Sequence, residues 1–141
     1  MKLTGFFGIK AAVVALMALA VLTGCRRQSR WERIEREART FTAKECPFNV
    51  DDYTRMDSTT FDIDTKCYYY NYTVSGILDN DSIYNEELNE NYRRKTLDEI
   101  RTSIQLRGYK EAGLTLVFRY YSAQSGRLLS EYRFSKEDYS K

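Results

Sequence analysis

The stretch Cys67–Gly76, CYYYNYTVSG, decides the fold. Side chains along a β-strand point alternately to its two faces, so this pattern predicts a strand over Cys67–Ser75 with two unlike faces. The face suited to a core carries Tyr68, Tyr70, Tyr72 and Val74. The face suited to solvent carries Cys67, Tyr69, Asn71 and Thr73. The chain is therefore expected to contain a half-buried strand rich in tyrosine.

Three further strands are predicted around this one. A Thr-rich alternating segment over Met56–Asp62 reaches Cys67 through the turn sequence DIDTK. After Gly113, LTLVFRYY is typical of a strand, SAQSG of a hairpin turn and RLLSEYRFS of the returning strand. Leu116, Phe118 and Tyr120 share one face of the first of these two strands. Leu128, Tyr132 and Phe134 share one face of the returning strand.

An amphipathic helix is predicted before each pair of strands. The first begins after Ser29, which forms a capping-box pattern with Glu32. It should end near Lys44, because Pro47 disfavours helical geometry at the preceding residue. Its apolar face carries Trp31, Ile34, Ala38 and Phe41. The second is expected over residues 85–106, ending at Gly108, with Leu88, Tyr92, Leu97, Ile100 and Ile104 on one side.

The order helix, strand, strand, helix, strand, strand predicts an α+β fold with both helices packed on one face of an antiparallel sheet. The chain has 141 residues, of which 14% are aromatic, so residues 30–141 are expected to form a single packed domain. Lys2 and Lys10 account for the net charge of +2. The remaining charges balance, so nucleic acid is not an expected partner.

The first 24 residues are predicted to be a signal peptide. Lys2 and Lys10 precede twelve uncharged residues, Ala11–Leu22, which is too short for a spanning helix and typical of a signal core. The following Leu22-Thr23-Gly24-Cys25 resembles the lipobox of bacterial lipoproteins. An ordinary signal or an uncleaved anchor with a chance cysteine is the alternative.

The lipobox resemblance implies a covalent diacylglycerol and an N-acyl lipid at Cys25, which would hold the protein on a bilayer. Residues 25–29 would then be a lipidated tether. Position 26 is Arg rather than Asp, and the resemblance then implies the periplasmic face of the outer membrane. The three arginines Arg26, Arg27 and Arg30 either face lipid headgroups or are solvated in the tether.

Many chemistries are excluded by composition. The chain has no histidine, which removes His-based catalysis and His-containing zinc sites. Residues 79–90 resemble a calcium loop only superficially, because Tyr84 stands where that loop needs glycine. We expect neither a metal nor a cofactor beyond the lipid. No pair among the carboxylates is fixed about a substrate, the candidates being Asp51, Asp52, Asp57, Asp62 and Asp64.

Cys46 and Cys67 leave two alternatives open. In an oxidising periplasm they could form a disulfide that closes a loop of about 20 residues. Otherwise they are two separate buried thiols. A redox-active Cys46 is a weaker hypothesis, because there is no C-x-x-C pattern.

The segment Cys46–Ser58, CPFNVDDYTRMDS, resembles a pattern of small uncharacterised bacterial envelope proteins. The likeness extends over roughly Arg39–Tyr139, with Cys67 as a departure from the pattern, and it implies a shared fold but no activity. Physically, Asp51 or Asp57 could hold Arg55 and fix the entry of the chain into the sheet. A small recognition site built from the same three residues is the alternative.

The sequence thus favours a non-enzymatic, membrane-anchored binding or structural module that contacts another envelope protein. Tyrosine is common at interfaces, and the candidate contacts are Tyr69, Tyr121 and Tyr139, unless these merely form cross-strand pairs. A periplasmic immunity or inhibitor lipoprotein is a special case of this reading. The alternative of another class is a carboxylate-based hydrolase of envelope glycans.

Overall fold

A computed structural model describes residues 28–141. The predicted signal peptide, the predicted lipidation site Cys25 and the first residues of the predicted tether lie outside the described residues. No helix within residues 28–141 is long and apolar enough to cross a membrane.

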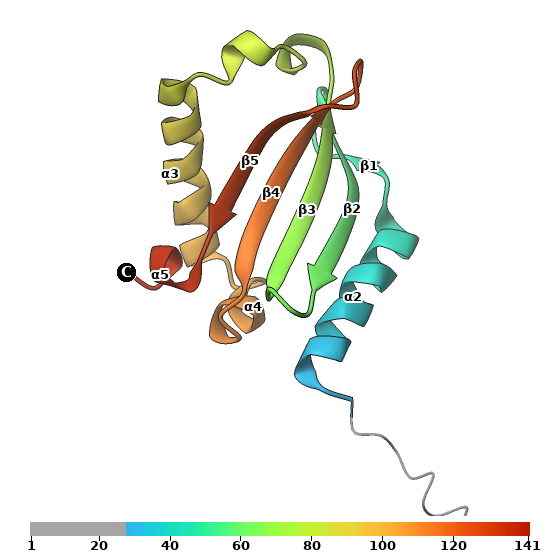
Figure 1. Cartoon of the computed structure of the whole chain (residues 1–141), viewed down its shortest axis with the longest axis vertical. Helices are drawn as coiled ribbons and strands as arrows, with labels where there is room; N and C mark the ends of the chain where they lie inside the picture. Colours follow the sequence, from blue (N-terminus) through green and yellow to red (C-terminus); the bar gives the residue numbers. More distant parts are fainter. Residues whose placement is uncertain (1–27) are drawn as a thin grey trace, which may run out of the picture.

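Five strands form one sheet in the order in which they occur along the chain (Figure 1). They are β1 (Phe48–Asn49), β2 (Thr54–Asp62), β3 (Cys67–Val74), β4 (Thr115–Ser122) and β5 (Leu128–Phe134). The four predicted strands are confirmed, while the two-residue β1 has no clear sequence pattern. The α+β class is confirmed as well.

The sheet is mixed, which differs in one pairing from the predicted antiparallel sheet. β3 and β4 run parallel, from Cys67 opposite Thr115 to Val74 opposite Ser122, whereas the other pairs are antiparallel. The reason lies in the connection between the two strands. A helical crossover returns the chain to the end of the sheet at which β3 begins, so β4 starts there and runs in the same direction. Strand propensity alone does not encode this direction.

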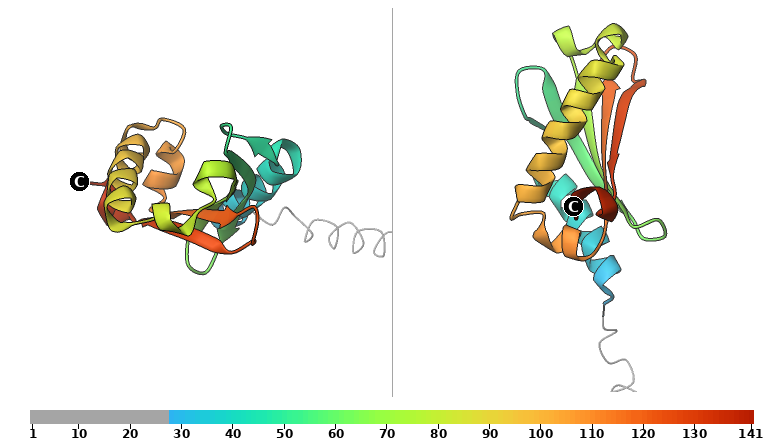
Figure 2. Two further views of the ribbon diagram at one scale, coloured as in Figure 1. Left: turned by 90° about the horizontal axis from the view of Figure 1, so that it is seen from above. Right: turned by 90° about the vertical axis from the view of Figure 1, so that its left-hand side faces the viewer.

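The helices lie on one face of the sheet, as predicted (Figure 2). α2 (Arg30–Glu45) packs on β2, and α3 (Glu86–Thr102) crosses the opposite half of the sheet near β5. The capping box is present, since Glu32 N–H donates to Ser29 Oγ (3.1 Å) and Ser29 N–H donates to Glu32 Oε2 (2.8 Å). Short helices follow as η1 (Gly76–Leu78), η2 (Asp81–Ile83), α4 (Arg107–Glu111) and α5 (Lys136–Tyr139).

The second long helix is shorter than predicted. α3 ends at Thr102, because Ser103 adopts an extended conformation, and Gly108 lies inside α4 instead of ending the helix. Lys110 Nζ donates to the carbonyls of Ile100 and Arg101, at 2.8 Å each. This lysine binds the free carbonyls that an α-helix leaves at its C-terminus.

The core lies between the helices and the inner face of the sheet. Ile34 and Ala38 of α2, Ile100 of α3, and Leu116 and Phe134 of the sheet are all buried. The inner face predicted for β3 is confirmed by the burial of Tyr68 and Val74 at its two ends. Between these residues Tyr70 and Tyr72 are only half-buried, which marks an incompletely covered part of the sheet.

Candidate functional site

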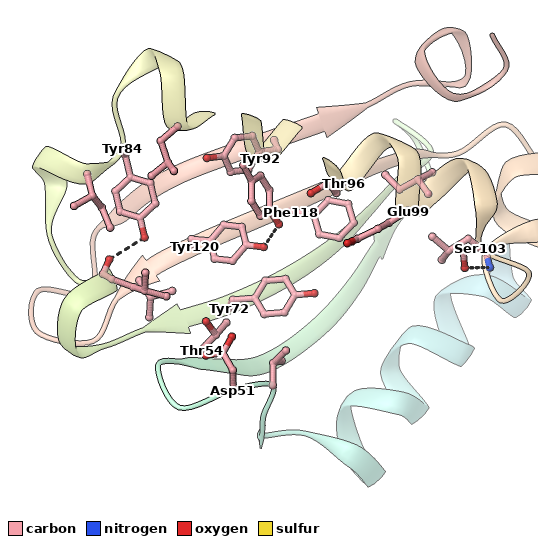
Figure 3. A pocket seen from close by; sticks show the side chains of 18 residues that line it. Asp51, Thr54, Tyr72, Tyr84, Tyr92, Thr96, Glu99, Ser103, Phe118 and Tyr120 are labelled. Carbon is pink, nitrogen blue, oxygen red and sulfur yellow. Dashed lines mark hydrogen bonds between the residues drawn. The ribbon is translucent and has the colours of Figure 1, made fainter. Parts of the chain in front are cut away.

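A groove of about 550 Å³ lies over this incompletely covered part of the sheet (Figure 3). Its floor is aromatic and consists of Tyr72 on β3 with Phe118 and Tyr120 on β4. The Tyr72 and Tyr120 rings are stacked, with centroids 5.0 Å apart and planes 10° apart. The groove exists because α2 and α3 cover opposite halves of the sheet and leave its central strands between them.

A tyrosine network attaches one wall of the groove to its floor. Tyr92 on α3 shares a hydrogen bond between hydroxyls with Tyr120, and Tyr132 on β5 donates to Asn89 Oδ1 at 2.5 Å. Burial raises the pKa of Tyr72 and of Tyr120 well above the ordinary value of 10.0. Both hydroxyls are therefore protonated at neutral pH and remain hydrogen-bond donors.

The rest of the lining comes from three parts of the chain. The β1–β2 connection contributes Val50 and Asp51, and α3 contributes Thr96 and Glu99 (Figure 3). The end of the groove is closed by η1 and η2, where the Tyr84 hydroxyl donates to the Leu78 carbonyl at 2.9 Å. These side chains come from distant parts of the sequence, so their grouping depends on the tertiary fold.

Two exposed apolar residues line the groove. Val50 and Leu88 line it although 53% and 44% of their surface is exposed. Three more exposed apolar residues directly adjoin lining residues in the sequence, namely Tyr53, Ile77 and Ile104. An apolar surface of this kind on a folded domain is typical of a binding site.

The charges that line the groove are of one sign. Asp51 and Glu99 lie on opposite walls, and no lysine or arginine is part of the lining. Asp51 Oδ1 accepts a hydrogen bond from the Tyr53 N–H at 2.8 Å, which stabilises the turn before β2. Both residues are solvent-exposed, whereas the carboxyl that acts as the acid in glycoside hydrolysis is typically held in an apolar pocket.

The predicted ion pair around Arg55 forms with only one of its two candidate partners. Arg55 Nε lies 2.6 Å from Asp57 Oδ1, and the Thr73 hydroxyl donates to the other oxygen of Asp57. This cluster lies on the face of the sheet away from the helices. Asp51 does not take part, because it points to the groove instead.

The two cysteines are free thiols in the structure, which corresponds to the second of the two alternatives. Cys46 ends α2 two residues before Phe48, whose partner is Met56, whereas Cys67 is paired with Asp62. Met56 and Asp62 are separated by roughly 20 Å along β2. A disulfide requires Cα atoms within about 7 Å of one another, so the bridge that the sequence left open as an alternative does not form in this fold.

The three candidate contact tyrosines have different environments. The prediction that Tyr139 contacts a partner is wrong, because this residue is buried and its hydroxyl donates to the Leu114 carbonyl at 2.7 Å. Tyr69 lies on the uncovered face of the sheet, where the Arg119 guanidinium stands 4.2 Å from its ring centroid. Tyr121 is half-buried on the same face, and a role of either residue in binding stays a prediction.

Apart from Asp51, the groove residues were not identified from the sequence as members of a site. Tyr72 and Tyr120 are predicted on the inner face, but that pattern equally suits an ordinary core. The sequence does indicate that this face is incompletely covered, because it carries more tyrosine than other large apolar residues. Tyrosine is suited to half-buried positions. Within residues 28–141, no cluster of three His, Cys, Asp or Glu side chains could hold a metal ion.

Comparison with known proteins identifies the family. Residues 29–130 match the family defined by a domain of unknown function (DUF8479), and the chain belongs to that family. No curated protein sequence matches the chain.

The fold is similar to three solved structures. A candidate secreted protein of Pseudomonas aeruginosa has 11% identity and a TM-score of 0.65, with 77% of this chain and 90% of that chain covered. The pilotin EpsS of the Vibrio vulnificus type II secretion system has 8% identity and a TM-score of 0.56 over the same shares. The type II secretion pilotin AspS of Vibrio cholerae has 12% identity and a TM-score of 0.51, covering 77% and 94%. At these identities the likeness shows a common fold.

Proposed function

We propose that this protein is a non-enzymatic, lipid-anchored module of the bacterial envelope that binds an apolar helix of another envelope protein. The observation that carries the proposal is the groove with its aromatic floor and exposed apolar rim. Apolar helices bind such grooves through side chains spaced three and four residues apart.

The floor of the groove favours a helix over an extended peptide. It is formed by side chains of β3 and β4, whose backbone groups are already paired with neighbouring strands on both sides. An extended peptide placed there would therefore leave its own N–H and C=O groups without partners, at a cost in free energy. A helix satisfies these groups internally and can present an apolar stripe to the aromatic rings.

The fold comparison supports a binding role in the envelope. Two of the similar structures are pilotins of type II secretion systems. We propose a comparable accessory role for this chain. Its anchor would be the lipid on Cys25 and its location the periplasmic face of the outer membrane. A toxin or hydrolase that the protein neutralises remains an alternative kind of partner.

One observation favours the alternative of an envelope glycan hydrolase, namely the two carboxylates on opposite walls of the groove. Their exposure and the apolar lining weigh against it. Purified protein incubated with peptidoglycan, followed by mass spectrometry of released fragments, separates the two functions. Fragments that are absent with the Glu99→Gln variant would establish the hydrolase and contradict the binding module.

Photo-crosslinking in living cells tests the binding role. A photoreactive amino acid at Leu88, on the rim of the groove, should crosslink to a short apolar helical segment of one envelope protein. The matched control is Thr60, which is exposed on the opposite face of the sheet and pairs with Tyr69. Equal crosslinking patterns from both positions, or products containing only lipid, would contradict the proposal.

A further inference from the structure

We propose that the helix bound in the groove is cationic, with lysine or arginine on both flanks of its apolar stripe. This inference rests on the proposed function, and it names the chemistry of the partner at that same site. It begins from the charges in the groove, where the two ionisable acids Asp51 and Glu99 stand on opposite walls without a basic neighbour in the lining.

The two carboxylates also lack ion-pair partners. Among residues 28–141 neither Asp51 nor Glu99 forms a salt bridge. The carboxylates on the uncovered face of the sheet differ in this respect. Glu131 contacts both Arg119 and Arg133, each at 2.7 Å, so that face is neutralised internally. The groove therefore keeps a negative charge that a cationic partner would neutralise.

The geometry of a bound helix places its flanks against these carboxylates. A helix with side chains is about 10–12 Å across, so its apolar stripe would rest on Tyr72, Phe118 and Tyr120 while its two sides face the walls. Lysine and arginine have long aliphatic stems that can lie along apolar surface while the charged head extends beyond it. Val50 provides such a surface beside Asp51.

The expected contribution is to selectivity more than to affinity. Ion pairs at a solvent-exposed rim change binding by a small factor, and we expect about three- to tenfold for both carboxylates together. A helix with acidic flanks would meet like charges on both walls and would be excluded. The apolar floor would then supply most of the affinity, while Asp51 and Glu99 would select among apolar helices.

A displayed library of helical miniproteins, randomised on one face, tests the inference without knowledge of the natural partner. The bait is the full-length chain prepared without its lipid. The domain over residues 28–141 is the part that it presents to the library. Selection is run in parallel against the unchanged chain, Asp51→Asn/Glu99→Gln, and Leu88→Arg, which places a charge on the rim of the groove. The matched control is Asp52→Asn/Glu87→Gln, which removes the same charge from exposed residues outside the lining.

The expected result is enrichment of an apolar stripe with basic flanks on the unchanged chain and on the control. The basic flanks should lose their enrichment on Asp51→Asn/Glu99→Gln, and the apolar stripe should persist there. Dissociation constants of a selected helix and its Lys→Gln counterpart should then differ by about three- to tenfold on the unchanged chain only.

Two other results would overturn the inference in distinguishable ways. Enrichment of apolar stripes without basic flanks, or basic flanks that persist on Asp51→Asn/Glu99→Gln, would refute the cationic partner and leave the proposed function standing. If no helix is enriched, or if the enrichment persists on Leu88→Arg, the binding of a helix in the groove is refuted. The present inference is then refuted as well.

Discussion

Gly76 shows how a single residue directs the chain out of the sheet. It follows β3 with φ +58°, a conformation that L side chains rarely adopt. A Cβ atom at this position would lie 2.8 Å from Cδ1 of Tyr53. The glycine thus permits both the turn into η1 and the close approach of the Tyr53 ring beside the groove.

Replacement of Gly76 by alanine should destabilise the domain by about 1–2 kcal/mol, because alanine is strained at positive φ and the ring must shift. Gly108→Ala is the matched control, since nothing lies within 4 Å of its Cβ position and it occupies a helix. That change should be neutral or slightly stabilising. Urea unfolding measures both; equal stabilities would refute the strain argument.

Glu131 is the residue whose ionisation should contribute to stability at neutral pH. Burial would raise its pKa, but hydrogen bonds from Arg119 and Arg133 outweigh this effect and hold the pKa below its usual 4.5. A carboxyl with a depressed pKa stabilises the fold fully above its unfolded-state pKa, and this contribution is lost as the pH falls through the folded-state value.

Glu131→Gln should therefore lower the melting temperature at pH 7, and the difference from the unchanged chain should shrink below about pH 4.5. Melting curves at pH 7, 5 and 3 test this. Glu137→Gln, at an exposed position on α5, serves as a control. A difference for Glu131→Gln that stays constant with pH would show that packing, and not ionisation, is responsible.

At the scale of elements, α2 completes the edge of the sheet that β1 leaves open. β1 pairs only with Arg55 and Met56 of β2. Further along β2, the Thr42 hydroxyl of α2 accepts from the Thr59 N–H at 2.8 Å and donates to its carbonyl at 2.9 Å. The helix thereby satisfies backbone groups that a neighbouring strand would otherwise pair.

Thr42→Val should cost about 1–3 kcal/mol, because it keeps the shape of the side chain but leaves Thr59 backbone groups without partners. Thr40→Val, one position before Phe41 on the exposed side of the same helix, should change stability by less than about 0.5 kcal/mol. Chemical denaturation of both variants measures the difference. Similar losses in both would mean that helix propensity is responsible.

At the scale of the whole molecule, the domain is an incomplete two-layer structure. Its helices lie on one face, over the two outer halves of the sheet, and leave the central strands open, and α2 begins at the end of the domain opposite η1 and η2 (Figure 1). On a membrane-anchored protein, this arrangement would direct the η1–η2 end of the groove away from the bilayer. The proposed partner helix would complete the missing part of the helical layer.

Metabolic labelling with palmitate in cells tests the anchor. The intact chain should incorporate label, and Cys25→Ser should not, because the thiol is the acceptor of the diacylglycerol in the lipobox reading. Cys46→Ser is the matched control and should be labelled normally, since that cysteine ends α2 within the folded domain. Labelling of Cys25→Ser would rule out the lipobox.

The sequence by itself determined the local structure. The capping box at Ser29, the alternation in Cys67–Ser75 and the turn after Ser122 each depend on contacts within a few residues, and all three are confirmed. The predicted inner face of β3 is confirmed for the same reason, because the two-residue period of a strand is a local property.

Only the tertiary structure decided the rest. The parallel pairing of β3 with β4, the separation of Cys46 from Cys67 and the burial of Tyr139 all depend on how distant segments pack. The groove depends on this packing as well, since Asp51, Tyr72 and Glu99 lie on three separate elements. A pattern of apolar residues shows that a face is covered, but the position of each covering helix is set by packing across the whole domain. This packing left the central tyrosines only half-buried.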